Sequence, residues 1–288
     1  DRLHGQPGHF RVVRCRRCGL IYLNPRPTPS AIGRYYPDDY RPYIAPVRAA
    51  RKRVTRWDAR YGLYKRLRVV SAHQATGRLL DVGCATGDFL AFAQESGWET
   101  HGVELVEPAA AYCRDVLGLH VVTGDLLDAA YPDAHFDAIT LWNVFEHLYD
   151  PAATLQELRR IVKPGGWLVM AVPNPDSLDA RLFGPAWAGY DVPRHLYTFP
   201  TPVLHDLLAR EGFEVVDRRC VDSSHFIFFL SLRFWLLARP RCSRLVRWAE
   251  RLEHSRPVRL LTAPYFRLVD ALGKGPVVTV IARQEGGA

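Results

Sequence analysis

Short apolar runs alternate with helix-compatible segments along the middle of the chain. The runs predicted as strands cover residues 78–82, 99–103, 120–126, 136–143 and 167–170. The clearest helix is Pro151–Val162, which Asp150 can cap and Pro164-Gly165 ends. Strands that alternate with helices predict an α/β fold with a doubly wound, mostly parallel sheet.

A glycine turn follows the first of these strands. Asp81 ends the apolar run, and Gly83 and Gly87 bracket the turn before the next helix. The spacing G-x-x-x-G differs from the G-x-G-x-x-G that cradles a pyrophosphate, and the Asp81 carboxylate would repel a phosphate. The loop therefore favours a ligand with a cationic or neutral edge, and S-adenosylmethionine (SAM) fits this description.

Five motifs in order strengthen this interpretation: DVGCATG, HGVELVEP, TGDLLD, FDAITLWNVFEHL and KPGGWLVMAVPN. From about Thr55 to the C-terminus the chain resembles the class I SAM-dependent methyltransferases, with Ala85 where that family often has glycine. The resemblance implies a Rossmann-like sheet of seven strands with an antiparallel last strand. The segments CRRCGLIYLNPRP and DVPRHLYTF resemble a subgroup with an N-terminal zinc knuckle and small-molecule substrates, often sugars or natural products.

The resemblance also implies which residues hold the cofactor. Asp81 and the turn around Cys84 would bind the methionine end of SAM, Glu104 beside Leu105 would accept the ribose hydroxyls, and Asp125 would meet the adenine amino group. The remaining predicted cofactor residues are Gly83, Gly87, Leu126 against the ring and Asn143 beside the methionine segment. The alternative is that these acids cap helices or lie in ordinary surface turns.

Three residues are candidates for catalysis. His195 is a plausible general base because imidazole titrates near neutral pH, and Arg194 could clamp a phosphate or carboxylate. His147 could face the substrate or fix the helix after the fourth strand. The alternative for His195 is that it only orders its loop.

Two cysteines near the N-terminus have metal-ligand spacing. Cys15 and Cys18 form half of a zinc knuckle, and His4 or His9 could supply further ligands. The other possibility is a folded turn with two unliganded thiols. Zinc is therefore predicted as a second cofactor only with this half-site.

A long insertion separates the last two predicted strands, Phe213–Asp222 and Pro276–Ala282. It contains the apolar segment 226–238 and then a basic amphipathic helix, which predicts a helical cap. Residues 226–252 could rest on anionic lipid, pack on the sheet, or form a homodimer interface. The predicted divisions are an N-terminal appendage (1–48), a SAM-binding domain (49–222), the cap (223–275) and the last strand (276–288).

Composition and cysteine usage indicate the class of protein and its compartment. The 288 residues carry a net charge of +8 and a pI of about 9.3, with 48% hydrophobic residues, which fits a globular protein with a basic surface. The six cysteines give no disulfide framework, no signal peptide is visible and no apolar run reaches bilayer length, so we expect a cytoplasmic protein with membrane association left open. The chain begins at Asp1, which leaves room for upstream residues.

The sequence thus predicts a SAM-dependent methyltransferase whose acceptor is a small-molecule hydroxyl on a sugar, a lipid-linked compound or a natural product, with no nucleic acid partner. One alternative is a catalytically weak SAM-binding scaffold at a membrane surface. A nicotinamide oxidoreductase fits less well, because its Y-x-x-x-K pair, here Tyr61 and Lys65, precedes the glycine loop instead of following it.

Overall fold

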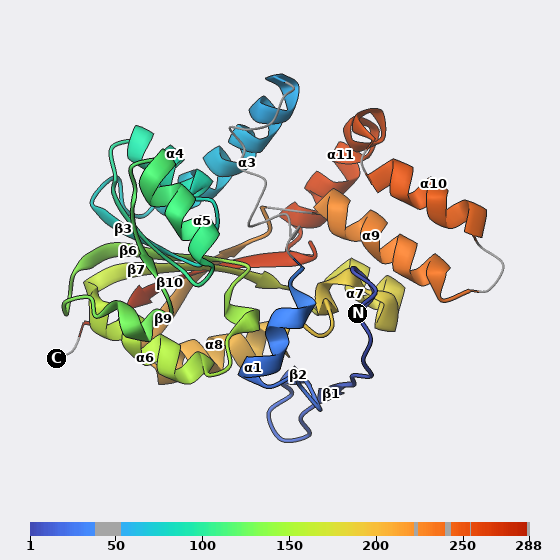
Figure 1. Ribbon diagram of the computed structural model, residues 1–288, viewed down its shortest axis with the longest axis horizontal. Coiled ribbons are helices and arrows are strands. Elements are labelled where there is room, and N and C mark those ends of the chain that lie inside the picture. Colours follow the sequence, from blue (N-terminus) through green and yellow to red (C-terminus); the bar gives the residue numbers. More distant parts are fainter. Residues whose placement is uncertain (38–52, 222–223, 240–242, 254, 287–288) are drawn as a thin grey trace. The chain divides into compact units, whose positions relative to one another are not determined.

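The computed structural model describes residues 1–37, 53–221, 224–239, 243–253 and 255–286. Its main feature is a seven-stranded sheet with the order β5-β4-β3-β6-β7-β10-β9 (Figure 1). The strands are β3 (Arg78–Val82), β4 (Glu99–Glu104), β5 (His120–Thr123), β6 (Phe136–Trp142), β7 (Val162–Pro173), β9 (Phe213–Arg219) and β10 (Val277–Gln284). Pairing of β3 with β4, of β3 with β6 and of β4 with β5 is parallel, so the predicted doubly wound α/β fold is confirmed.

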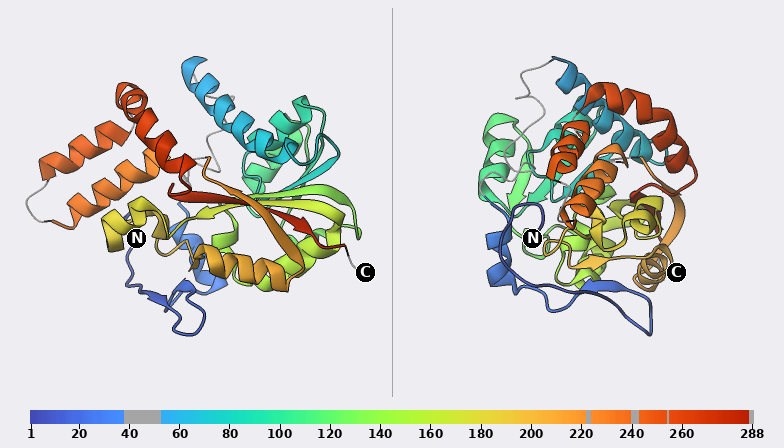
Figure 2. Two further views of the ribbon diagram at one scale, coloured as in Figure 1. Left: turned by 180° about the vertical axis from the view of Figure 1, so that it is seen from behind. Right: turned by 90° about the vertical axis from the view of Figure 1, so that its right-hand side faces the viewer.

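Helices follow the strands as the alternating pattern predicts. They are α3 (Arg53–Ser71), α4 (Asp88–Glu95), α5 (Glu107–Ala111), α6 (Pro151–Ile161) and α8 (Thr201–Arg210). Helices α4 and α5 lie on one face of the sheet and α6 lies on the other (Figures 1 and 2). The Asp150 side chain accepts a hydrogen bond from the Ala153 N–H and caps α6 as predicted.

Several predicted boundaries are wrong, among them the end of the strand predicted over Phe213–Asp222, which stops at Arg219. Helix α6 ends at Ile161 and β7 begins at once, so Lys163–Gly166 belong to the strand and do not separate it from the helix. The Gly165 N–H donates to the Gln284 side chain, which explains why this glycine stays in the sheet. Strand β5 stops at Thr123, which leaves Asp125 in the following loop.

The chain divides into two compact units, which we describe separately. One unit comprises Asp1–Tyr35, Ala171–His205 and Arg218–Thr279, and the other comprises Tyr36–Met170, Asp206–Asp217 and Val280–Ala288. The predicted domain divisions differ from these units and stay predictions.

The first unit contains a small sheet and most of the remaining helices. Strands β1 (Val12–Arg14), β2 (Ile21–Leu23) and β8 (Tyr197–Thr198) form an antiparallel sheet. The helices are α1 (Pro29–Ile32), α7 (Leu178–Phe183), α9 (Ser224–Leu237), α10 (Ser243–Glu253) and α11 (Arg256–Ala271). The last three confirm that a helical insertion lies between β9 and β10. Within the described residues, no helix is both long and apolar enough to cross a membrane.

The turn between β3 and α4 has an unusual backbone. Gly83 and Gly87 have φ values of +70° and +72°, which glycine adopts without steric cost. Ala85 lies between them with φ +48°, a region where a Cβ atom is unfavourable. The chain thus keeps an alanine at a position whose backbone favours glycine.

Ala85→Gly should therefore stabilise the protein. We expect the free energy of unfolding to rise by about 1 kcal/mol, because the substitution removes the left-handed strain. Urea denaturation measures it, with Ala59→Gly within α3 as a control that should lower stability by about 1 kcal/mol. A less stable Ala85→Gly protein would show that the turn does not strain this residue.

Candidate functional site

Asp81 is a buried carboxylate at the end of β3. Its register partners are Gly102 on β4 and Thr140 on β6, and only 3% of the residue is exposed. The Thr140 hydroxyl donates to Asp81 Oδ1 at 2.6 Å, a partner that the sequence analysis missed. Burial nevertheless raises the pKa of Asp81 to about 7. A ligand cation at this carboxylate would offset the cost of its burial.

Glu104 is the second buried carboxylate, at the end of the neighbouring strand β4. Its Oε2 accepts the Ala85 N–H at 2.8 Å and its Oε1 accepts the Val106 N–H at 2.9 Å. Burial raises the pKa of Glu104, although these two backbone hydrogen bonds favour the ionised form. Glu104 therefore ties the glycine turn to the loop after β4, a structural contact that its predicted ribose role did not anticipate.

The two glycines of the turn are required by packing within the protein. A Cβ atom on Gly83 would lie 2.6 Å from Val144 Cγ2, and one on Gly87 would lie 2.8 Å from Cys113 Sγ. These contacts give a reason for glycine that needs no ligand, because neighbouring side chains already occupy the space that a Cβ atom would fill.

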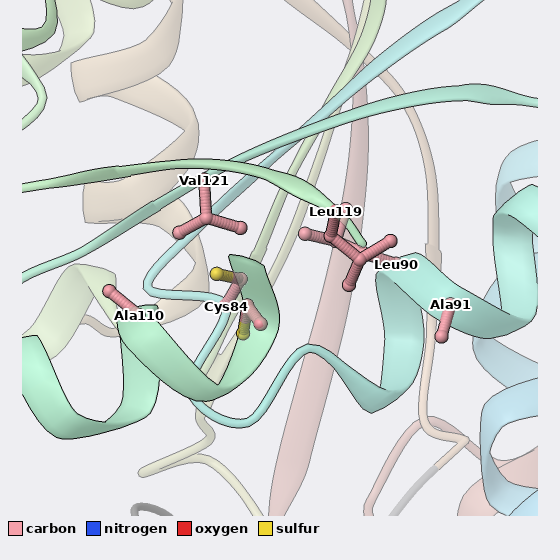
Figure 3. Packing of buried hydrophobic residues seen from close by; sticks show 7 residues of the cluster. Cys84, Leu90, Ala91, Ala110, Leu119 and Val121 are labelled. Atoms are coloured by element: carbon pink, nitrogen blue, oxygen red, sulfur yellow. The ribbon is translucent and has the colours of Figure 1, made fainter. Parts of the chain in front are cut away.

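Cys84 belongs to a buried cluster behind the turn (Figure 3). A hydrogen bond with Cys113, together with burial, raises the pKa of the Cys84 thiol. Cys113 Sγ in turn donates to the Ala85 carbonyl oxygen at 3.2 Å. These contacts give Cys84 a packing role, and its predicted contact with the cofactor stays a prediction.

The other predicted cofactor residues lie at the same end of the sheet. Leu105 directly follows β4 and is 73% exposed, which leaves its side chain accessible to an apolar ring. Asp125 is exposed and accepts the Leu127 N–H, whereas Leu126 is buried. Asn143 follows β6 with φ +56°. The carboxyl ends of β3, β4 and β6 thus bring Asp81, Glu104 and Asn143 to one edge, where open α/β sheets bind ligands.

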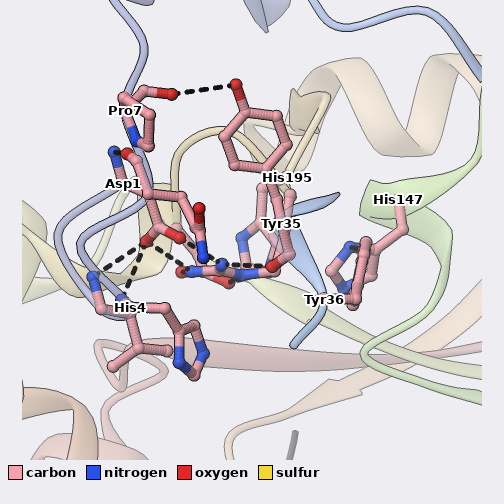
Figure 4. A network of polar contacts seen from close by, with 11 residues as sticks. Asp1, His4, Pro7, Tyr35, Tyr36, His147 and His195 are labelled. Atoms are coloured by element: carbon pink, nitrogen blue, oxygen red, sulfur yellow. Dashed lines mark hydrogen bonds and ion pairs between the residues drawn. The ribbon is translucent and has the colours of Figure 1, made fainter. Parts of the chain in front are cut away.

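His195 belongs to the other unit and is largely buried, with 12% of its side chain exposed (Figure 4). Its Nδ1 lies 2.8 Å from the Gly189 carbonyl oxygen, which assigns the ring proton to Nδ1 and the lone pair to Nε2. Burial lowers the pKa of His195, although the Asp191 carboxylate opposes this effect. The ring is therefore neutral at pH 7, as a general base must be.

Arg194 is fully buried and contacts Asp1 and Tyr35, which Figure 4 labels in a network of polar contacts. Its guanidinium donates twice to the Asp191 carboxylate, twice to the Asp1 carboxylate and once to the Tyr35 carbonyl oxygen. These bonds account for all five N–H groups of the guanidinium. The geometry argues against the predicted substrate clamp and indicates that Arg194 anchors the N-terminal segment within its unit.

His147 lies in a short helical turn after β6, next to the buried Glu146. Its Nδ1 forms a 3.0 Å hydrogen bond with the Tyr36 hydroxyl, a partner that sequence reasoning missed because 111 residues separate the two (Figure 4). This bond fixes the ring orientation. A catalytic role for His147 stays a prediction.

Cys15 and Cys18 lie in the turn between β1 and β2. The Gly19 N–H donates to the Cys15 carbonyl oxygen, and backbone hydrogen bonds from Cys18 and Arg17 lower the pKa of the Cys15 thiol. Among the residues that the structure describes, no other histidine, cysteine or acid groups with this pair closely enough to complete a metal site. The donors present fit half of a zinc site.

Arg194→Lys tests the anchoring role. Lysine has three donors where this network uses five, and it cannot pair with both oxygens of a carboxylate as the guanidinium does, so we expect a loss of about 3 kcal/mol in the free energy of unfolding. The matched control is Arg2→Lys, an exposed arginine that donates to the Pro185 carbonyl oxygen, which should cost less than about 1 kcal/mol. Wild-type stability in Arg194→Lys would contradict the anchoring role.

Comparison with known proteins agrees with this geometry. A family model described as a methyltransferase domain matches residues 54–218. A ubiquinone biosynthesis O-methyltransferase from Cereibacter sphaeroides is 31% identical over 155 residues, which cover 49% of this chain and 62% of that protein. The chain thus matches less than two thirds of that relative's length.

Solved structures share the fold. A SAM-dependent methyltransferase from Archaeoglobus fulgidus matches with a TM-score of 0.51 and 21% identity over 78% of this chain and 94% of the other. The [4+2]-cyclase SpnF matches with a TM-score of 0.52 and 23% identity over 77% and 81%. Since the family model covers more than half of the chain, the protein belongs to the methyltransferase domain family and has the class I SAM-dependent methyltransferase fold.

Proposed function

We propose that this protein binds SAM at the carboxyl edge of β3 and β4 and transfers its methyl group to a small-molecule acceptor. The observation that carries the proposal is the pair of buried carboxylates, Asp81 and Glu104, on either side of a glycine turn. A carboxylate whose pKa is raised to about 7 by burial gains most from a bound cation, and SAM carries an ammonium and a sulfonium.

The residues have separate roles in this proposal. Asp81 receives the ammonium of the cofactor, and the second lone pairs of the Glu104 carboxylate accept the ribose hydroxyls. The exposed Leu105 joins Leu126 against the adenine ring. When bound, the cofactor supplies an electrophilic methyl group with a good neutral leaving group. Positioning of the acceptor then provides much of the rate enhancement. Asp125, Leu126 and Asn143 complete the proposed cofactor contacts.

For the acceptor we propose a hydroxyl on a sugar, a lipid-linked compound or a natural product. The Cereibacter relative is named for O-methylation in ubiquinone biosynthesis, which supports a small molecule with a hydroxyl. His195 would take the proton of that hydroxyl on Nε2, since its Nδ1 is directed at the Gly189 carbonyl oxygen.

Several finer assignments remain proposals. Zinc at Cys15 and Cys18 would require ligands beyond the described pair, and the cytoplasmic location and a homodimer rest on sequence alone.

A SAM-binding scaffold without methyl transfer is the main alternative, because a cyclase shares the fold and fold alone does not decide chemistry. Incubation of the protein with labelled SAM and, separately, with NAD distinguishes a SAM site from a nicotinamide site.

The affinity for SAM should depend on pH through Asp81. Below its pKa of about 7 this carboxyl must lose a proton to receive the ammonium, so we expect affinity to rise up to about tenfold per unit between pH 5 and 7. Calorimetry with SAM should show this slope in the wild type and in Asp128→Asn, an exposed control. Asp81→Asn should bind weakly with no slope, and a retained slope would exclude Asp81 as its source.

The same titration acts on the protein without cofactor. A raised pKa in the folded state contributes stability below the unfolded value near 4, and this contribution is lost as the pH rises through about 7. At pH 8 the Asp81→Asn variant should therefore be more stable than the wild type. Its free energy of unfolding should be larger by an amount on the order of a few kcal/mol.

His195→Asn tests the proposed base. The asparagine N–H can replace the donor to the Gly189 carbonyl oxygen, while the group that accepts the proton is lost. We expect unchanged SAM affinity and a fall in turnover of about 10²–10⁴-fold, measured as transfer of labelled methyl to the acceptor. His120→Asn, an exposed control, should retain full activity. Unchanged turnover in His195→Asn would remove His195 from the mechanism.

A further inference from the structure

The inserted helices α9, α10 and α11 differ in how well the rest of their unit covers them. The segment predicted for lipid contact, residues 226–252, spans most of α9 and α10, and the structure covers most of α9. Leu230 and Phe234 pack against Phe183 and Trp187, and the Ser231 hydroxyl accepts the buried Ala188 N–H. Helix α9 therefore belongs to the core of its unit and is not the exposed surface.

Helices α10 and α11 each use a narrow face to contact α9. On α10 this face includes Ala249 and Glu253, whose carboxylate lies 3.7 Å from Arg233 of α9. On α11 it includes Phe266, whose ring packs against the ring of Phe228 on α9, with 5.6 Å between the ring centroids. Most other described side chains of both helices are exposed, although Val269 of α11 is buried.

The outer face of α11 carries a stripe of large apolar side chains. Leu261, Tyr265, Leu268 and Leu272 are 82%, 49%, 60% and 64% exposed. Their spacing of four, three and four residues places them on one side of the helix, roughly a third of a turn from the buried Phe266. Leu245 and Trp248 are likewise exposed on α10. Single exposed leucines are common, but a continuous stripe indicates an interaction surface.

Basic side chains lie on the polar sides of the same two helices, and on α11 they point away from the leucine stripe. The exposed arginines of α10 and α11 are Arg244, Arg247, Arg251, Arg256, Arg259 and Arg267. Among the described residues of these helices, Glu250 alone is an exposed acid, since Glu253 is buried and Asp270 accepts the Ser224 hydroxyl. The surface of α10 and α11 is thus both apolar and strongly cationic.

The charge distribution selects among possible occupants. A second copy would bring two sets of these arginines together without matching carboxylates, which disfavours self-association through this face. A nucleic acid would match the charge but offers no apolar layer for exposed leucines. An anionic membrane surface offers phosphate headgroups and an acyl layer beneath them.

We propose that α10 and α11 dock the protein on anionic lipid bilayers, with the leucine stripe in the headgroup boundary and the arginines on the phosphates. The binding strength of an interfacial helix is the sum of its buried apolar area and its electrostatic attraction to anionic lipid. Each arginine near an anionic surface strengthens binding about fivefold at low salt, and the effect falls as salt screens the charge. This docking does not depend on the cofactor site.

Flotation of the full chain with lipid vesicles tests the proposal. The protein should float with vesicles that mix phosphatidylglycerol with phosphatidylcholine, and should not float with phosphatidylcholine alone. High salt should release it from the mixed vesicles. Failure to float with the mixed vesicles at low salt would overturn the proposal.

Paired variants separate the two signals. Leu261→Ser with Leu268→Ser removes the stripe, whereas Leu182→Ser on α7 is a control at another exposed leucine. Arg247→Glu with Arg251→Glu should weaken binding more than about 20-fold, whereas Arg68→Glu with Arg210→Glu, at exposed positions on α3 and α8, changes the net charge equally and should leave flotation nearly intact. Flotation of both test variants as in the wild type would assign binding to another surface.

Two further measurements keep the alternatives distinct. Sedimentation without lipid should show no dimer that forms through the leucine stripe. A wild-type dimer that dissociates when Leu261→Ser and Leu268→Ser are introduced would show that the stripe joins two copies. Calorimetry with SAM should give the same affinity in every docking variant. A protein that floats but does not bind SAM would refute the proposed function and leave the docking intact.

Discussion

The buried Glu104 carboxylate is the contact on which the candidate site depends. It accepts the N–H of Ala85 in the glycine turn and the N–H of Val106 after β4, so one side chain holds two loops in place. Burial of this charge is costly, and the charge of Glu104 also contributes to the raised pKa of Asp81. The two neighbouring buried acids therefore lower the stability of the fold. Such an arrangement is typical of functional sites and unusual in a hydrophobic core.

The sequence predicted the strands and the acids that end them, because periodicity and spacing are local properties. It did not reveal why the turn needs glycine. The answer lies with Val144 and Cys113, which approach from other elements and occupy the space that a Cβ atom would fill. Thr140 escaped notice for the same reason, since a threonine inside an apolar strand gives no sign that it donates to Asp81 on the neighbouring strand.

Arg194 shows a different limit of sequence reasoning. An arginine beside a histidine in a loop is typical of an anion site, and nothing local distinguishes it from an anchor. Its carboxylate partners are Asp191, three positions away, and Asp1, 193 positions away. Only the folded arrangement shows that the five donors are satisfied. The apolar helix α9 is a similar case, because the residues that cover it come from α7 and the turns after it.

The helical insertion adds a surface to this chain without disturbing the seven-stranded sheet of the methyltransferase fold. Strands β9 and β10 are neighbours in the sheet although α9, α10 and α11 lie between them in the chain. Loop-closure entropy grows only with the logarithm of loop length, by about 0.6 kcal/mol per doubling, so an insertion of this size hardly weakens the strand pairing. The inserted helices contribute their own buried contacts through Phe228, Phe266 and Ala249. Their outer faces can therefore change in charge and hydrophobicity without altering Asp81 or Glu104, which makes docking and cofactor binding separable properties of one chain.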